Sequence, residues 1–194
     1  MPLACPSFAG TAGRGNNAKK SAAGRGERMV KVSLCEFART GLFGPISLGM
    51  SREELRLLLG NPPMWDADST IEDASIWRYS DIEFYFQEHK LWMIFTDHES
   101  LADGGETLEI GAWVVRPGLP RNDLEPALRE HEITYRASHP AYDPRQCHVL
   151  TSVGVKFSFL EARDYDDEEL GLFSWCQLCE SPQPQSPESS LPPR

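Results

Sequence analysis

The chain has 194 residues, of which 40% are hydrophobic and 25% charged, a composition typical of one well-buried globular domain or two small fused ones. No apolar run approaches the roughly 18–20 residues that a membrane span needs, and the start around Leu3-Ala4-Cys5 lacks the basic and apolar regions of a signal peptide. We therefore expect a cytoplasmic protein that does not bind membranes, and its five cysteines, an odd number, do not indicate a disulfide framework.

The net charge of −10 is spread unevenly along the chain. Residues 1–28 hold five basic side chains against Glu27 alone, so the remaining residues carry a charge of −14. A folded part this acidic repels phosphate backbones, which argues against nucleic-acid binding by the core and favours a basic protein partner. Acidic charge that serves only solubility explains the excess equally well. The oligomeric state is left open.

Both ends of the chain are predicted to be disordered. Residues 1–28 are rich in Gly, Ala, Ser and Arg, and they offer too little apolar area to offset the entropy of ordering. Residues 181–194 form a proline-rich tail. Because Met29 opens the first apolar stretch, we hypothesise that it is the true initiator. The folded part between the ends divides into a first unit, 29–117, and a second unit, 118–180.

The first unit opens with two elements whose ends are marked by glycines. Residues 30–40 form either a short helix that stops at Gly41 or an alternating strand, and the apolar spacing favours the helix. Ser51 and Glu54 have the spacing of a capping box, and Gly60 ends the helix that they start. Its apolar face consists of Leu55, Leu58 and Leu59.

An antiparallel meander is predicted to follow this helix. Alternation in the second strand directs Phe84 and Phe86 to the core and Tyr85 to the opposite face. The short link 88–90 is suited to a hairpin. The four predicted strands are Ile76–Tyr79, Glu83–Gln87, Leu91–Thr96 and Glu109–Val115.

The second unit has the same order of elements. Its helix is expected to start at Asn122 or Asp123, because Pro126 is tolerated only near the first turn. Asp164 to Glu169 is read as a wide acidic turn. The strands are predicted at Ile133–Ala137, His148–Ser152, Val155–Leu160 and Gly171–Leu178.

The two units share a sequence pattern. The segment Gly49–Leu59 matches Gly118–Leu128 at an offset of 69 residues, and Phe84 matches Phe157 at an offset of 73. A nearly constant offset indicates two copies of one unit. We therefore predict an α+β fold of two tandem helix-plus-antiparallel-meander repeats, which form one curved sheet with the helices on one face.

The helix opening Gly49-Met50-Ser51-Arg52-Glu53-Glu54-Leu55, together with this order of elements over residues 44–178, resembles the β-lactamase inhibitor protein family. Proteins of that family use tandem helix-plus-four-strand repeats to form one curved sheet. The resemblance implies that a sheet face bearing aromatic side chains binds another protein. The chain also resembles small acidic bacterial immunity-type proteins, which neutralise a toxin.

Other patterns in the chain do not define a catalytic, metal or cofactor site. Trp175-Cys176-Gln177-Leu178-Cys179 is similar to a WCxxC redox motif, but a strand precedes it and prolines follow, so no helix N-terminus activates the first thiol. A zinc site there would need two further ligands, for which Cys147 with His148 is the nearest suggestion. The acidic segments 66–70 and 164–169 lack the glycine and terminal glutamate of a calcium loop.

The predicted partner-binding residues are Glu83, Tyr85, Trp92, Glu109 and Trp113. Exposed aromatic side chains beside carboxylates are typical of binding hot spots, although tryptophans in strands also serve as core residues. The sequence therefore predicts a non-enzymatic, acidic protein-binding module of the immunity or inhibitor kind. The alternative is an enzyme or small-ligand binder with a pocket between the repeats, and a third option is nucleic-acid contact through the basic head.

Overall fold

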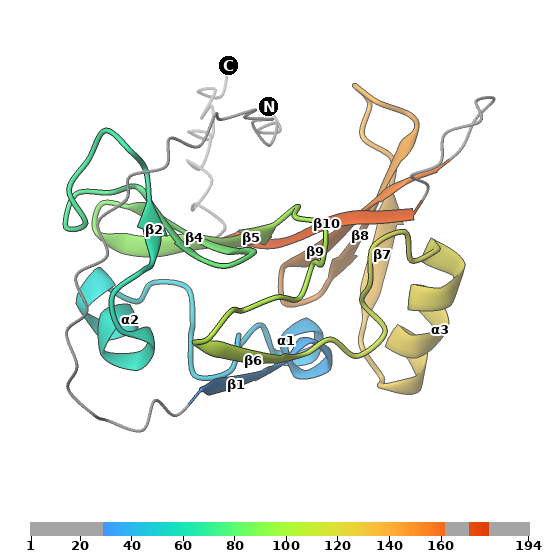
Figure 1. The fold of residues 1–194 in the computed structure, drawn as a ribbon. Helices are drawn as coiled ribbons and strands as arrows, with labels where there is room; N and C mark the ends of the chain where they lie inside the picture. The colour runs from blue at the N-terminus through green and yellow to red at the C-terminus, as the bar shows by residue number, and fades with distance from the viewer. Residues whose placement is uncertain (1–28, 162–170, 179–194) are drawn as a thin grey trace, which may run out of the picture.

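The computed structural model describes residues 29–161 and 171–178, and it has an α+β fold with a large antiparallel sheet (Figure 1). The predicted fold class is confirmed at this level. The eight strands of this sheet lie in the order β2-β3-β4-β5-β10-β9-β8-β7. They are β2 (Met64–Trp65), β3 (Ile76–Tyr79), β4 (Ile82–Gln87), β5 (Lys90–Thr96), β7 (Tyr135–Ser138), β8 (Gln146–Thr151), β9 (Val155–Leu160) and β10 (Gly171–Leu178).

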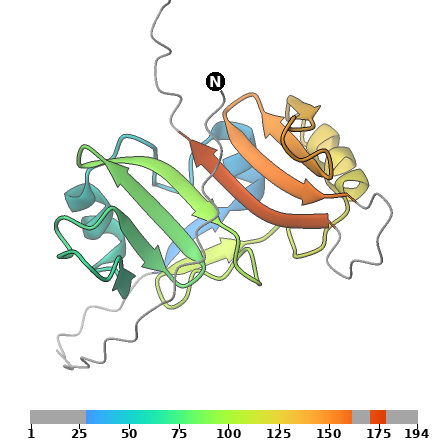
Figure 2. The same ribbon diagram turned by 90° about the horizontal axis from the view of Figure 1, so that it is seen from above.

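The large sheet consists of two groups of four strands that meet at β5 and β10. Within the first half, β2 to β5, and the second half, β7 to β10, each strand pairs with the next one in the chain. The two halves join through antiparallel pairing of β10 with β5, in which Trp175 lies opposite Thr96 and Leu178 opposite Met93. Figure 2 shows the first half in green and the second half in orange to red. A strand from each half therefore closes the edge of the other.

A second, two-stranded sheet lies outside this arrangement. It pairs β1 (Val30–Ser33) with β6 (Leu108–Gly111) in parallel. The prediction that Glu109–Val115 is the last strand of the first meander is therefore wrong. The strand that completes the first half is instead β2, which precedes β3 in the chain and follows two prolines. With only two residues, β2 is too short to show the alternating pattern by which a strand is predicted.

The segment 30–40, whose sequence allowed either a helix or a strand, contains a strand followed by a helix. Strand β1 ends at Ser33, whose side chain accepts a hydrogen bond from the Glu36 N–H and so caps α1 (Leu34–Thr40). Gly41 ends this helix in the left-handed conformation, with φ of 76°. The apolar residues of the helix face the core, as the spacing of Leu34 and Phe37 predicted.

The predicted capping box and stop signal of α2 (Arg52–Leu59) are confirmed. The Ser51 side chain accepts from the Glu54 N–H, the Glu54 carboxylate accepts from the Ser51 N–H at 2.7 Å, and Gly60 is the C-cap. Leu55 and Leu59 are buried, whereas Leu58 is 37% exposed. The apolar face is therefore narrower than the run of leucines predicts.

Helix α3 (Arg121–Glu130) starts one residue before the earlier of the two predicted starts. Its N-cap is Pro120, which makes no side-chain capping bond, and Pro126 lies inside the helix. A proline at an interior position lacks the N–H that the helical ladder uses. The buried side chains Leu124, Ala127 and Leu128 supply the compensating contacts, so tertiary packing decides the start of this helix.

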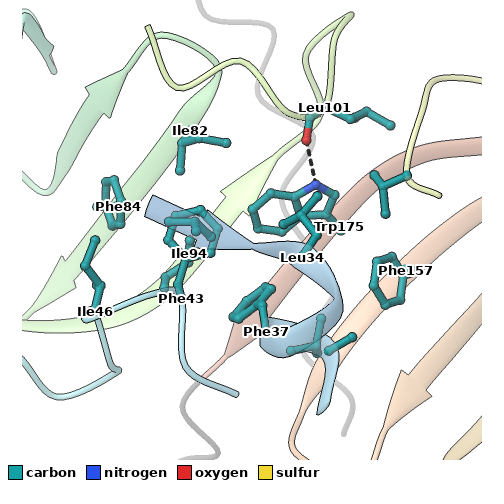
Figure 3. Packing of buried hydrophobic residues seen from close by; sticks show 14 of the residues in the cluster. Leu34, Phe37, Phe43, Ile46, Ile82, Phe84, Ile94, Leu101, Phe157 and Trp175 are labelled. Carbon is teal, nitrogen blue, oxygen red and sulfur yellow. Dashed lines mark hydrogen bonds between the residues drawn. The ribbon is translucent and has the colours of Figure 1, made fainter. Parts of the chain in front are cut away.

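One hydrophobic cluster connects the three helices of the described residues with both halves of the large sheet. At its centre, Trp175 of β10 is fully buried and donates a hydrogen bond from Nε1 to the Leu101 carbonyl at 2.8 Å (Figure 3). Its ring lies 5.5 Å from Phe37 and 5.6 Å from Phe43, centroid to centroid. The strand that joins the halves thus also carries the central side chain of the core. Among the described helices, none has the length and apolar character needed to cross a membrane.

We predict that Trp175→Ala destabilises the fold by about 3–5 kcal/mol, because it leaves a cavity where α1 and the two sheet halves meet and unpairs the Leu101 carbonyl. The free energy of unfolding in urea measures this loss. A matched control is Trp65→Ala, since Trp65 is 43% exposed on the edge strand β2. An equal loss in both variants would contradict the central role of Trp175.

Candidate functional site

Alternate side chains of strand β4 point to the core and to the opposite face of the sheet, as the alternating sequence predicted. Ile82, Phe84 and Phe86 are buried, whereas Glu83 and Tyr85 between them are partly exposed. Pairing with the neighbouring strands places Arg78 of β3 and Phe95 of β5 opposite Glu83. We call Arg78, Glu83, Tyr85, Trp92 and Phe95 the aromatic–acidic face.

Tyr85 is the centre of the aromatic–acidic face. Its ring meets Trp92 and Phe95 edge to face, with centroid distances of 6.3 and 6.2 Å. Its hydroxyl donates to the Glu83 carboxylate at 2.7 Å. Burial raises the pKa of Tyr85 well above its usual range, and the acceptor Glu83 adds to this effect. The phenol therefore stays protonated and holds one oxygen of the carboxylate in place.

The other oxygen of Glu83 belongs to a small network of charges. Oε1 lies 3.4 Å from Nε2 of His98 and 3.9 Å from Nε of Arg78. Asp97, next to His98, has a pKa that burial raises; His98 opposes this rise and Glu83 adds to it. A further positive charge at this place would lower the pKa of Asp97.

The structure brings together three of the five predicted binding residues. Glu83, Tyr85 and Trp92 lie on the aromatic–acidic face. Glu109 lies on β6 in the small sheet, where its carboxylate pairs with Lys31 at 3.4 Å. Trp113 lies in the turn after β6, with φ of 56°, and its ring contacts His131 at 5.5 Å. Glu109 and Trp113 are separated from the large sheet because β6 ends at Gly111 and pairs with β1.

Four members of the charge and aromatic network were not predicted from the sequence, namely Arg78, Phe95, Asp97 and His98. Arg78 follows from the register of the β3–β4 hairpin, since a two-residue loop at 80–81 puts it opposite Glu83. Phe95 gave no signal, because both faces of its strand are apolar in sequence. His98 follows the end of β5, where no periodic pattern applies.

The second half of the sheet holds a pocket of about 320 Å³. It lies at the β7–β8 hairpin rather than between the halves, where the alternative hypothesis of an enzyme expected one. The lining includes no carboxylate, cysteine or histidine, so its serine and threonine hydroxyls have no carboxylate or imidazole base beside them among the lining residues. Its lining residues are Thr134, Tyr135, Arg136, Leu150, Thr151, Ser152 and Gly154.

The local structure at Cys176 does not fit the redox motif. Cys176 is buried within β10, so the predicted strand stands in place of the helix N-terminus that a WCxxC site needs. Its possible partner Cys179, and the acidic turn at Asp164–Glu169, lie outside the described residues. Cys147 is buried, whereas Cys35 is only partly buried.

Three side chains that can each bind a metal ion lie close together in the second half of the sheet. His139, Cys147 and Glu161 place a ring nitrogen, a thiol sulfur and a carboxylate oxygen within 4.8 Å of one another. The group lies in the second half of the sheet, away from the aromatic–acidic face, and no spacing in the sequence pointed to it.

No model of a known protein family matches the chain, and no curated protein matches it. Among solved structures, the fold is similar to that of an extracellular protein containing a SCP domain from Bacillus anthracis str. Ames, at 11% sequence identity and a TM-score of 0.34. The match covers 84% of this chain and 50% of that chain, so the chain spans half the length of that protein. A likeness of this size carries no argument about function.

A pH-dependent contribution to stability is expected from His148, whose pKa is lowered from 6.5 to about 4, first by burial and then by Lys156 and His139. The unfolded chain binds this proton more tightly, so the free energy of unfolding falls as the pH drops from 6.5 to about 4. His148→Gln removes that loss. Relative to wild type, the variant should gain stability in urea unfolding near pH 4.5 and not near pH 7.5; an equal difference at both pH values would contradict the prediction.

Proposed function

We propose that the protein is a non-enzymatic, acidic protein-binding module of the inhibitor or immunity kind, built from two copies of a helix-plus-four-strand unit. It binds a basic segment of a partner protein through the aromatic–acidic face. The observation that carries the proposal is the cluster around Tyr85, where edge-to-face aromatic rings adjoin the carboxylates of Glu83 and Asp97 on the face opposite the core.

The order of the strands supports the two-copy architecture. Helix α2 precedes β2 to β5, helix α3 precedes β7 to β10, and the last strand of each set lies at the junction. The helices begin at Arg52 and Arg121, at the offset of 69 residues seen in the sequence. Leu55 and Leu124, which correspond at the same offset, are both fully buried. In Figure 1, α1 and α2 lie below the large sheet and α3 lies beside β7.

Backbone hydrogen bonds at the start of each unit support the same conclusion. The N–H of Gly49 donates to the Leu91 carbonyl, and the N–H of Leu91 donates to the Met50 carbonyl, both at 2.7 Å. The segment 118–119 makes the same pair of bonds with Leu172, at 3.0 and 2.9 Å. In both units, therefore, the residues before the helix are tied to the strand that forms the junction.

The resemblance to the β-lactamase inhibitor family supports a role for the sheet face. In that family a sheet face bearing aromatic side chains binds another protein, and Tyr85, Trp92 and Phe95 provide such side chains here. Aromatic rings offer large contact areas at a small cost in conformational entropy. A partner that covers this face would act by steric exclusion, without any chemical step.

The charge of the face favours a basic partner. The whole chain carries −10, so its field attracts a basic protein at low ionic strength. At the face itself, Glu83 already lies beside Arg78 and His98, and a Lys or Arg of the partner would add positive charge near Asp97 and would lower its pKa. The long-range field of the chain and the local charges of the face therefore both favour a positively charged partner.

The test is a binding measurement between the purified full chain and the basic proteins encoded beside its gene. We expect one of them to bind at low salt and to be released as the salt concentration rises, because exposed charges are screened. Tyr85→Ala should weaken this binding by about tenfold or more, which is the loss expected at a hot spot.

The matched control for Tyr85→Ala is Tyr142→Ala, because Tyr142 is 63% exposed and lies outside the strands of the aromatic–acidic face. This control should bind like the wild type. Binding that is insensitive to salt, or that both tyrosine variants weaken equally, would contradict the proposal.

A further inference from the structure

The strands of the second half bring His139, Cys147 and Glu161 to one place. His139 follows the end of β7, Cys147 lies in β8, and Glu161 follows the end of β9. Strand β8 pairs with both of the others, and the Glu161 N–H donates to the Arg145 carbonyl at 2.7 Å. The three side chains are thus held by adjacent parts of the sheet rather than by a flexible loop alone.

The distances are close to those of an occupied metal site. The ligand atoms of the three residues all lie within 4.8 Å of one another, and Nε2 of His139 is 3.1 Å from Oε2 of Glu161. Tetrahedral zinc with bonds of about 2.0–2.3 Å separates its ligand atoms by roughly 3.3–3.8 Å. Small rotations of the side chains are sufficient to reach this geometry.

The ligand types select a class of metal ion. A thiolate and an imidazole bind borderline transition metals such as zinc, whereas calcium and magnesium prefer oxygen alone. We propose that His139, Cys147 and Glu161 form a binding site for a divalent transition metal, zinc foremost, with the fourth position taken by water. Cys147 is buried and His139 is exposed, so the ion reaches the site from the solvent side of the histidine.

Arg121, the first residue of α3, supplies the positive charge in the metal-free protein. Its Nε lies 2.9 Å from Oε1 of Glu161, and its Nη1 donates to Sγ of Cys147 at 3.6 Å. This Nε is buried, but among the described residues it forms no hydrogen bond. The guanidinium is therefore near the Glu161 carboxylate but poorly aligned with it. Oε1 of Glu125, on the same helix, lies 3.8 Å from Nε of Arg121. When a metal ion displaces the guanidinium from Glu161 and Cys147, Arg121 pairs with Glu125 instead.

The corresponding place in the first half indicates that the fold does not require this cluster. There, Arg52 donates to the Ala74 carbonyl at 2.6 Å and lies over the Phe86 ring at 4.5 Å. Phe84 lies opposite Trp77 and Phe157 lies opposite Val149, so the residue of the first half that corresponds to Cys147 is Ser75. An arginine at the start of the helix is therefore held in both halves, but the thiol belongs to the second half.

The experiment uses the full chain, stripped of metal with a chelator and titrated with zinc and with cobalt(II). We expect one equivalent to bind, a thiolate-to-cobalt charge-transfer band in the absorption spectrum, and a higher melting temperature with zinc. Cys147→Ser should remove the band, and His139→Gln and Glu161→Gln should each weaken binding by about tenfold or more. Arg121→Gln should bind zinc at least as tightly as the wild type, because it removes the competing cation.

Two matched controls keep the test specific. His148→Gln changes the neighbouring histidine on the opposite face of β8, and Cys35→Ser removes a thiol in α1. Both should bind like the wild type. If Cys147→Ser fails to fold, the substitutions at the partly exposed His139 and Glu161 still decide the question. No uptake by the wild type, or unchanged uptake in the His139 and Glu161 variants, would overturn the proposal; neither outcome bears on partner binding.

Discussion

The antiparallel pairing of β5 with β10 is the constraint on which the rest of the structure depends. Each half of the large sheet has four strands, and without this pairing each would expose an unpaired inner edge. Trp175 on β10 belongs to the same hydrophobic cluster as Phe84 of the first half and Phe157 of the second. Backbone pairing and apolar burial therefore act at the same strand, and neither half has a complete core alone.

The alternation of β4 also decides which side chains lie on the aromatic–acidic face. Because Phe84 faces the core, its neighbours Glu83 and Tyr85 face away from it and are partly exposed. Glu83 and Tyr85 hold each other through a 2.7 Å hydrogen bond on that side. The aromatic–acidic face is thus a consequence of core packing, and its geometry in the free protein would reduce the entropic cost of the proposed binding.

Local signals in the sequence predicted local structure well. The capping box of α2 and the alternation of β4 depend on residues a few positions apart, and both are as expected. Contacts between distant segments were not predictable in this way. Strand β6 pairs with β1, about 78 residues earlier in the chain, which took Glu109 and Trp113 away from the proposed site. Phe95 joined the site although its strand is apolar on both faces.

The same limit applies to the proposed metal site. Its three ligands are separated by 8 and 14 residues, spacings that match no metal motif, and only the order β9-β8-β7 makes them neighbours. Helix α3 starts there from a proline without a side-chain cap, and its first residue, Arg121, is anchored to Glu161. In α2 a capping box fixes the equivalent start. The second unit therefore replaces a local cap with a tertiary ion pair, and a metal ion at the proposed site would act directly on the attachment of α3 to the sheet.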